Sequence, residues 1–194
     1  MNAAVQLASL DYAKPLQEPD ELAQLAKLLA DERVLSYAEI GARYGGSFET
    51  IMRALPVGAF GMTVDWPGAP FGDSNSAPIL LSAAARLRRE GYAVDCLFGD
   101  ARGDVYQQFT RRAPVDALMI DADHSYFAVK RDFEVYAPLA RIVILHDIAA
   151  PEHVRSHDGR PVEVPRFWNE IKGKYRHLEI IAPDSLMGIG VIWR

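Results

Sequence analysis

Two short apolar runs of the sequence each end in acidic and histidine residues. The run 117–120 is followed by Asp121 and His124, and the run 142–145 by His146 and Asp147. If the two runs are neighbouring parallel strands, about 4.8 Å apart, these side chains converge at one edge of a sheet. Crowded carboxylates repel each other unless a proton or a cation lies between them. The pattern therefore predicts a functional site rather than ordinary core.

This cluster could supply two kinds of chemistry. Carboxylate oxygens are ligands for Mg²⁺ or another divalent cation, and the candidate ligands are Asp121, His146 and Asp147. The sequence leaves open whether a metal is bound. His124 is the residue of the cluster that we expect to act as a general base, because an imidazole titrates near neutral pH.

A glycine-rich turn follows an earlier apolar run and precedes a helix-like segment, at residues 39–47. Such turns bring backbone N–H groups close to a ligand. The turn departs from the dinucleotide pattern G-x-G-x-x-G because Arg43 occupies the second glycine position, which disfavours NAD. The candidate ligand contacts here are Glu39, Gly41, Gly45, Gly46 and Ser47.

Two further strand ends carry acids that suit a nucleoside. Asp65 ends the second run, 24 residues after Gly41, where an acid can accept hydrogen bonds from both ribose hydroxyls. The third run ends in Gly99-Asp100-Ala101. Asp100 could contact an adenine amino group or cap the helix after it, and the sequence does not separate these alternatives.

The elements that must position these residues alternate between strand and helix. Strands are expected at 34–40, 59–64, 93–98, 117–120, 142–145, 178–181 and 188–193, and helices from residue 19 and at 47–55, 77–90, 104–112 and 125–137. This rhythm predicts βαβ units, a mostly parallel sheet with helices on both faces, and a final hairpin. Long loops at 65–77 and 149–165 are candidates for binding lids.

With these motifs, the chain resembles the class I S-adenosylmethionine-dependent methyltransferases over residues 34–194. It is most similar to the small-molecule branch that includes cephalosporin-hydroxylase-like, sugar and catechol-type O-methyltransferases. The resemblance implies an α/β Rossmann-like, doubly wound sheet of seven strands in the order 3-2-1-4-5-7-6, with strand 7 antiparallel. It also implies that S-adenosylmethionine is bound by Glu39, Gly41, Gly45, Gly46, Ser47, Asp65, Asp100, Ala101 and Asp121.

The resemblance also bears on the chemistry. In the sugar methyltransferases a histidine three residues after the first metal aspartate is the base, and His124 stands at that position. Metal-dependent relatives carry two acids, or Asp-Asn, where this chain has His146-Asp147. The expected reaction is methyl transfer to a hydroxyl of a small molecule, with or without Mg²⁺. Alternatives are a metal-assisted hydrolase, a dehydrogenase, or a binding protein on the same fold that has no turnover.

Length and composition limit the remaining possibilities. The 194 residues fit one domain, 34–194, preceded by an arm and helix at 1–33 that either covers the cofactor or makes a homodimer contact. Cys96, the single cysteine, excludes an intrachain disulfide and agrees with a cytoplasmic location. A net charge of −5 disfavours nucleic acid as a partner, and we expect the basic cluster 86–89 to be a solvated helix face. No apolar run is long enough for a membrane helix.

Overall fold

A seven-stranded β-sheet forms the centre of the protein. The computed structural model describes residues 15–69 and 74–194. The strands are β1 (Ser36–Ile40), β2 (Phe60–Asp65), β3 (Ala93–Phe98), β4 (Val115–Ile120), β5 (Ala140–His146), β6 (Arg176–Ile180) and β7 (Ile189–Trp193). Their order is β3-β2-β1-β4-β5-β7-β6. β1 to β5 pair in parallel, whereas β7 is antiparallel to both β5 and β6, which confirms the expected topology.

Strands in the middle of this sheet are buried on both faces. Residues 142–145 of β5 are all 0% exposed, which explains why the strand is a continuous apolar run rather than an alternating one. In the register of the parallel pairs, Ile40 lies opposite Ile120, and Ile120 lies opposite Leu145. The carboxyl ends of β1, β4 and β5 therefore lie side by side, where ligands bind in open α/β sheets.

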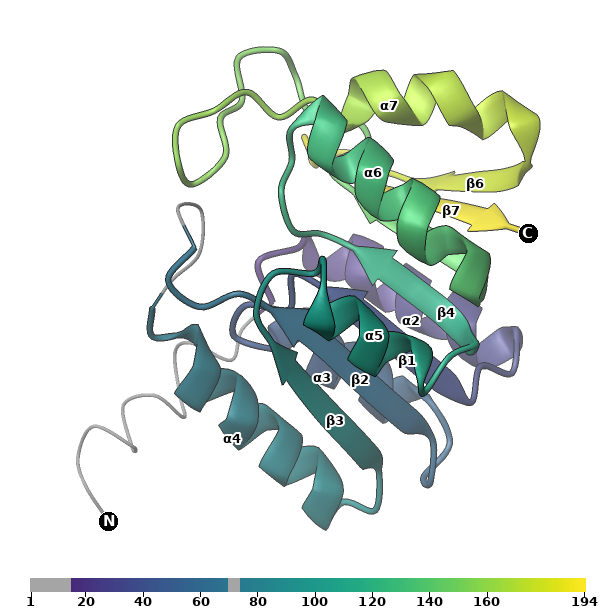
Figure 1. Cartoon of the computed structure of the whole chain (residues 1–194). Coiled ribbons are helices and arrows are strands. Elements are labelled where there is room, and N and C mark those ends of the chain that lie inside the picture. The colour runs from purple at the N-terminus through teal and green to yellow at the C-terminus, as the bar shows by residue number, and fades with distance from the viewer. Residues whose placement is uncertain (1–14, 70–73) are drawn as a thin grey trace.

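Helices cover both faces of the sheet (Figure 1). The helices are α2 (Pro19–Asp31), α3 (Gly46–Ala54), α4 (Ser76–Arg89), α5 (Asp104–Thr110), α6 (Tyr126–Tyr136) and α7 (Val164–Ile171), with short 3-10 turns η1 (Ala137–Leu139) and η2 (Lys172–Lys174). Buried residues of α2, α3 and α4 form one apolar cluster with the sheet, and those of α5, α6 and α7 form another. None of the helices in the described ranges is long and apolar enough to cross a membrane.

In the described part of the chain, α7 is a helix that the sequence pattern does not predict. α7 begins inside the expected loop 149–165 and fills the interval before β6. Its buried residues, Val164, Phe167, Trp168 and Ile171, have the spacing of an amphipathic helix, and proline is favoured in a first helical turn, as here. The local signal is present, but the strand–helix alternation that predicts the other helices ends with the fifth apolar run.

β4 and β5 begin two residues earlier than expected. The reason is a pair of polar residues near the start of the two strands: Arg141 Nε lies 3.0 Å from Asp116 Oδ1. The two charges interrupt the apolar pattern of each strand, yet they satisfy each other across the sheet. An apolar run therefore underestimates a strand whose first residues pair polar groups.

Of the two expected long loops, 65–77 is described in part and 149–165 throughout. Residues 70–73 of the first, and 1–14 of the N-terminal arm, lie outside the described part of the chain. The second loop folds into a small hairpin, with a bridge between Arg155 and Pro161 and a hydrogen bond from Ser156 N to Arg160 O of 2.9 Å. Glu163 N then donates to His124 O at 2.8 Å, so the hairpin is joined to the loop after β4.

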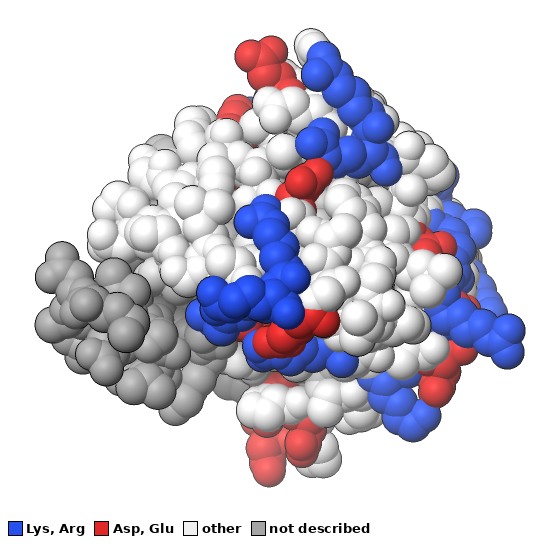
Figure 2. All heavy atoms as spheres, turned by 90° about the horizontal axis from the view of Figure 1, so that it is seen from below, with Lys and Arg blue, Asp and Glu red and all other residues white. Residues whose placement is uncertain are grey.

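The basic cluster on α4 is not simply a solvated face. Arg86 makes two hydrogen bonds of 2.7 Å to Glu49, a residue that is 4% exposed, and Arg88 donates to Val94 O. Arg53 bridges Glu49 and Glu90. Figure 2, which shows the molecule from below, also has Lys and Arg side chains beside Asp and Glu side chains. Arg86 therefore joins α4 to α3, and Arg88 joins α4 to β3.

Candidate functional site

A cavity lies at the carboxyl edge of the sheet. Its walls come from the loops that follow β1 to β5, from residues 15–17, and from the hairpin after β5. Of the predicted site residues, those that line it are Gly41, Gly46, Ser47, Asp65, Asp100, Ala101, Asp121, His124, His146 and Asp147. The topology thus gathers residues that are more than 100 positions apart in the sequence.

The glycine turn allows β1 and β4 to meet closely at this edge. Gly41 has φ +91°, and a Cβ there would lie 2.3 Å from the backbone oxygen of Asp121. Gly45, at φ +83°, instead packs against Leu80 and Ala83 of α4. Gly41 is therefore needed for the site, whereas Gly45 serves helix packing and is not among the residues that line the cavity.

Glu39 lies beneath the cavity rather than in its wall. The side chain is 1% exposed and accepts hydrogen bonds from Ser47 Oγ at 2.5 Å and Tyr37 Oη at 2.8 Å. Burial raises the pKa of Glu39 to about 7, although these two hydrogen bonds oppose the shift. Any contact with a ligand would therefore pass through Ser47, which is itself part of the wall.

The two nucleoside-type acids have different surroundings. Asp65 accepts hydrogen bonds from Arg43 N at 3.0 Å and Ser76 Oγ at 2.6 Å, so the glycine turn and the start of α4 both fix it. Asp100 accepts a hydrogen bond from Arg102 N at 3.1 Å. The alternative that Asp100 caps the next helix is wrong, because Gly103 is the N-cap of α5.

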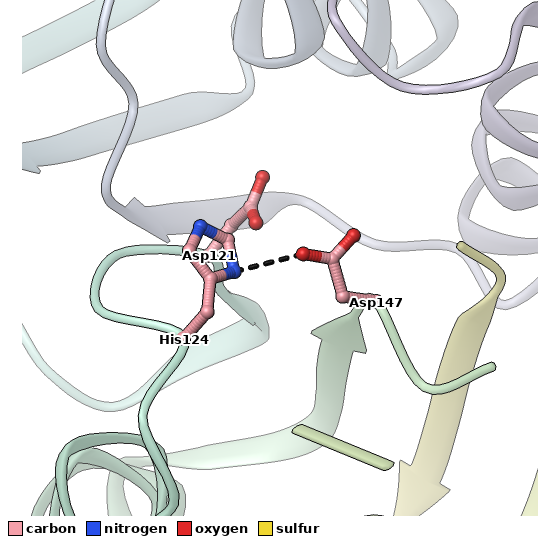
Figure 3. Close-up of side chains that lie close together, drawn as sticks. All are labelled: Asp121, His124 and Asp147. Atoms are coloured by element: carbon pink, nitrogen blue, oxygen red, sulfur yellow. Dashed lines mark ion pairs between the residues drawn. The ribbon is translucent and has the colours of Figure 1, made fainter. Parts of the chain in front are cut away.

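The acids and histidines after β4 and β5 form one connected cluster, of which Figure 3 draws Asp121, His124 and Asp147. His124 Nδ1 lies 2.8 Å from Asp147 Oδ2. His146 Nδ1 lies 3.1 Å from Asp121 Oδ1 and 2.9 Å from Asp147 Oδ1. The sequence-based expectation that these four side chains converge is met by the geometry.

The pairing sets the charges of the cluster. Burial lowers the pKa of His124, but the hydrogen bond to Asp147 and the nearby carboxylates outweigh it, so the pKa is raised above its ordinary value. Burial also lowers the pKa of His146, but the two carboxylates, Asp121 above all, raise it well above its ordinary value. Burial raises the pKa of Asp147, but its hydrogen bonds to both histidines dominate and lower it. These shifts keep Asp147 ionised and make both imidazoles stronger bases than a free histidine.

The arrangement differs from the expected metal-ligand set. Among the described residues, Asp121, His124 and Asp147 each offer a ligand atom, and these atoms lie within 4.8 Å of one another. His146 is not part of this group: its Nδ1 faces both carboxylates, and its Nε2 is buried without a hydrogen-bond partner in the described structure. The geometry thus puts His124 where the sequence suggested His146.

Three polar residues of the site, Gln17, Arg160 and Asp132, are not predicted by the sequence. Gln17 Nε2 donates to Asp121 Oδ2 at 2.7 Å. Arg160 of the hairpin lies 3.3 Å from Asp123. Asp132 of α6 is 3% exposed and lines the cavity. The loop that carries Arg160 is a predicted lid, but nothing local in the sequence distinguishes Gln17 from an ordinary surface glutamine.

Comparison with solved structures identifies the class of fold. The chain superposes on an O-methyltransferase from Bacillus cereus in complex with S-adenosylhomocysteine, with a TM-score of 0.71 and 21% identity, covering 100% of this chain and 92% of that one. The O-methyltransferase TomG from Streptomyces achromogenes, in complex with S-adenosylmethionine, gives a TM-score of 0.64 and 18% identity, covering 99% and 96%. The fold is therefore that of the class I S-adenosylmethionine-dependent methyltransferases.

The family follows from the sequence itself. A family described as a methyltransferase domain matches residues 38–148, the interval that contains the glycine turn and the acid–histidine cluster. Because this match covers more than half of the chain, the protein belongs to that methyltransferase family. No curated protein sequence matches the chain significantly.

Proposed function

We propose that this methyltransferase transfers the methyl group of S-adenosylmethionine to a hydroxyl of a small molecule, with His124 as the general base. The observation that carries the proposal is the pair formed by His124 Nδ1 and Asp147 Oδ2, 2.8 Å apart, at the wall of the cavity. A carboxylate at Nδ1 favours the tautomer whose Nε2 has a free lone pair. His124 is thereby prepared to accept a proton from a bound hydroxyl.

The reaction needs little else from the protein. The acceptor oxygen attacks the sulfonium methyl in line, the carbon–sulfur bond breaks, and the sulfur leaves as the neutral thioether S-adenosylhomocysteine. The hydroxyl proton passes to His124 Nε2, and Asp147 stabilises the imidazolium that results. The glycine turn and Asp65 orient the cofactor, which makes the attack effectively unimolecular.

A divalent cation is a second candidate at the same place, because the donor set fits one. Two carboxylates and one imidazole within 4.8 Å of one another suit Mn²⁺ or Mg²⁺, and the nitrogen donor favours Mn²⁺. Asp121, His124 and Asp147 would hold the ion, which would lower the pKa of a bound hydroxyl. His124 would then be a ligand instead of the base, so the two candidates exclude each other.

Calorimetric titration with S-adenosylhomocysteine, first with Mn²⁺ or Mg²⁺ and then with EDTA, tests the cofactor. We expect binding in both conditions. Methyl transfer is then assayed with a panel of phenols, catechols and sugars, comparing the wild type with His124→Ala and with His177→Ala, an exposed histidine on β6. His124→Ala should keep its affinity for S-adenosylhomocysteine within about threefold and lose at least about 100-fold in kcat.

Turnover in EDTA and turnover of His124→Ala together distinguish the base from the cation. Turnover that survives EDTA but not His124→Ala supports the base, whereas turnover lost in EDTA and restored by Mn²⁺ supports the cation. Equal turnover in His124→Ala and the wild type would contradict both roles. A folded wild type that fails to bind S-adenosylhomocysteine would overturn the proposed function as a whole.

A further inference from the structure

The segment just before α2 forms part of the cavity wall. Pro15, Leu16 and Gln17 line it, although they lie outside the interval that matches the methyltransferase family. The Gln17 side chain is 7% exposed, which is unusual for a glutamine outside a helix or strand, since polar side chains are mostly left in water. Its burial is explained by a specific contact.

That contact is to the carboxylate at the centre of the site. Gln17 Nε2 donates to Asp121 Oδ2 at 2.7 Å, across 104 residues of sequence, while His146 Nδ1 faces Asp121 Oδ1 at 3.1 Å. The two carboxylate oxygens of Asp121 are therefore held by two segments that are far apart in the sequence. A carboxylate held at one oxygen still rotates about its last torsion, which is broad, whereas two partners fix its plane.

An amide suits this position better than a charged group. A lysine or arginine would neutralise Asp121, whereas an amide donates one N–H and leaves the negative charge in place. From these observations we infer that Gln17 is a positioning residue, which fixes the Asp121 carboxylate for the bound cofactor, so that the N-terminal segment completes the site.

The inference rests on the proposed function and is tested through cofactor binding. The affinity for S-adenosylhomocysteine is measured by calorimetry for the wild type, Gln17→Ala, Gln17→Glu and Gln24→Ala, with circular dichroism as the check on folding. Gln24 is the matched control, because it is an exposed glutamine on the adjoining helix. We expect Gln24→Ala to bind like the wild type and Gln17→Ala to bind about 5- to 10-fold more weakly.

Gln17→Glu provides a readout that a general structural role would not give. The new carboxylate would face Asp121 at hydrogen-bond distance and repel it. The Gln17→Glu variant should therefore bind S-adenosylhomocysteine more weakly than Gln17→Ala. Adding Asp121→Asn to Gln17→Glu exchanges donor and acceptor and should recover at least threefold of the lost affinity.

The inference is overturned if all Gln17 variants bind within twofold of the wild type, or if Gln17→Glu is no worse than Gln17→Ala and gains nothing from Asp121→Asn. Lack of binding by the folded wild type has a different meaning, because it removes the proposed function on which the inference rests.

Discussion

At the scale of single residues, this site concentrates buried ionisable groups that depend on one another. Glu39 is fully enclosed under the glycine turn and is held by Tyr37 and Ser47. Above it, Asp121 and Asp147 share His146. Perturbed acids and bases gathered at one strand edge are typical of functional sites. The charge state of each group is therefore linked to the stability of the fold as well as to the proposed reaction.

Glu39 gives a prediction about pH and stability. Its pKa rises from an ordinary 4.5 to about 7 on folding, so between these values the folded protein retains a proton that the unfolded chain has released. The free energy of unfolding should therefore fall as pH rises through this window, by roughly 3 kcal/mol in total. Urea unfolding between pH 4.5 and 8 should show this fall for the wild type and a flatter profile for Glu39→Gln.

Other groups titrate in the same range, so the comparison between variants carries the test. The raised pKa values of His124 and His146 also lower stability as pH rises, but they are present in both proteins. Glu134→Gln, at an exposed position of α6, is the control and should follow the wild type. Parallel profiles for wild type and Glu39→Gln would show that Glu39 titrates normally in the folded protein.

At the scale of elements, the site depends on how closely two strand ends approach. Asp121 N donates to Ile40 O at 2.8 Å, and the next residue of the turn, Gly41, leaves no room for a side chain against the loop after β4. This close approach of the two strand ends brings the Asp121 backbone against Gly41. A change in this contact would move Asp121, which lines the cavity, even though the substituted glycine has no side chain.

The pair Gly41 and Gly58 separates this steric effect from backbone strain. Both have φ close to +90°, but a Cβ at Gly58 meets nothing within 4 Å, whereas one at Gly41 meets the Asp121 backbone. Gly58→Ala should cost only the strain of a left-handed residue, about 1–2 kcal/mol, and leave binding of S-adenosylhomocysteine unchanged. Gly41→Ala should be less stable than Gly58→Ala and should bind at least about tenfold more weakly, as measured by calorimetry. Similar effects of the two substitutions would contradict the close approach.

At the scale of the whole molecule, the N-terminal helix belongs to the same core as the sheet. Leu22, Leu25 and Leu29 of α2 are at most 1% exposed and share a cluster with β1, β5 and β7. Polar contacts add to this packing: Glu21 Oε1 accepts a hydrogen bond from Ala182 N at 3.0 Å, and Glu32 Oε1 accepts one from Trp193 Nε1 at 3.0 Å. The division at residue 33 remains a prediction, but α2 and the C-terminal strands are tied together.

Truncation of the α2 core should therefore weaken the entire protein. We expect Leu25→Ala to lower the free energy of unfolding by about 2–5 kcal/mol, the range for a buried leucine. Far-UV circular dichroism and tryptophan fluorescence should report one common transition. Gln24→Ala, one residue away but exposed, should change stability by less than about 0.5 kcal/mol. Two separate transitions, or an equally small effect of Leu25→Ala, would identify α2 as an independent appendage.

Local signals in the sequence predict the sheet and the positions that gather at the candidate site. Apolar runs, glycine turns and the residues at strand ends are local signals, and parallel strands place their carboxyl ends at one edge. For that reason the convergence of Asp121, His124, His146 and Asp147 is predictable from the sequence alone. The unexpected helix α7 is also encoded locally, by the spacing of its buried residues.

Which polar groups pair with one another follows from the packing of the folded chain. His124 lies against Asp147, His146 lies between both carboxylates, and Gln17 reaches Asp121 from 104 residues away. These contacts depend on side-chain torsions and on packing between segments that are distant in the chain, and neither leaves a periodic pattern in the sequence. The strand ends fix where these polar groups meet. The packing of the side chains then fixes which groups pair with one another.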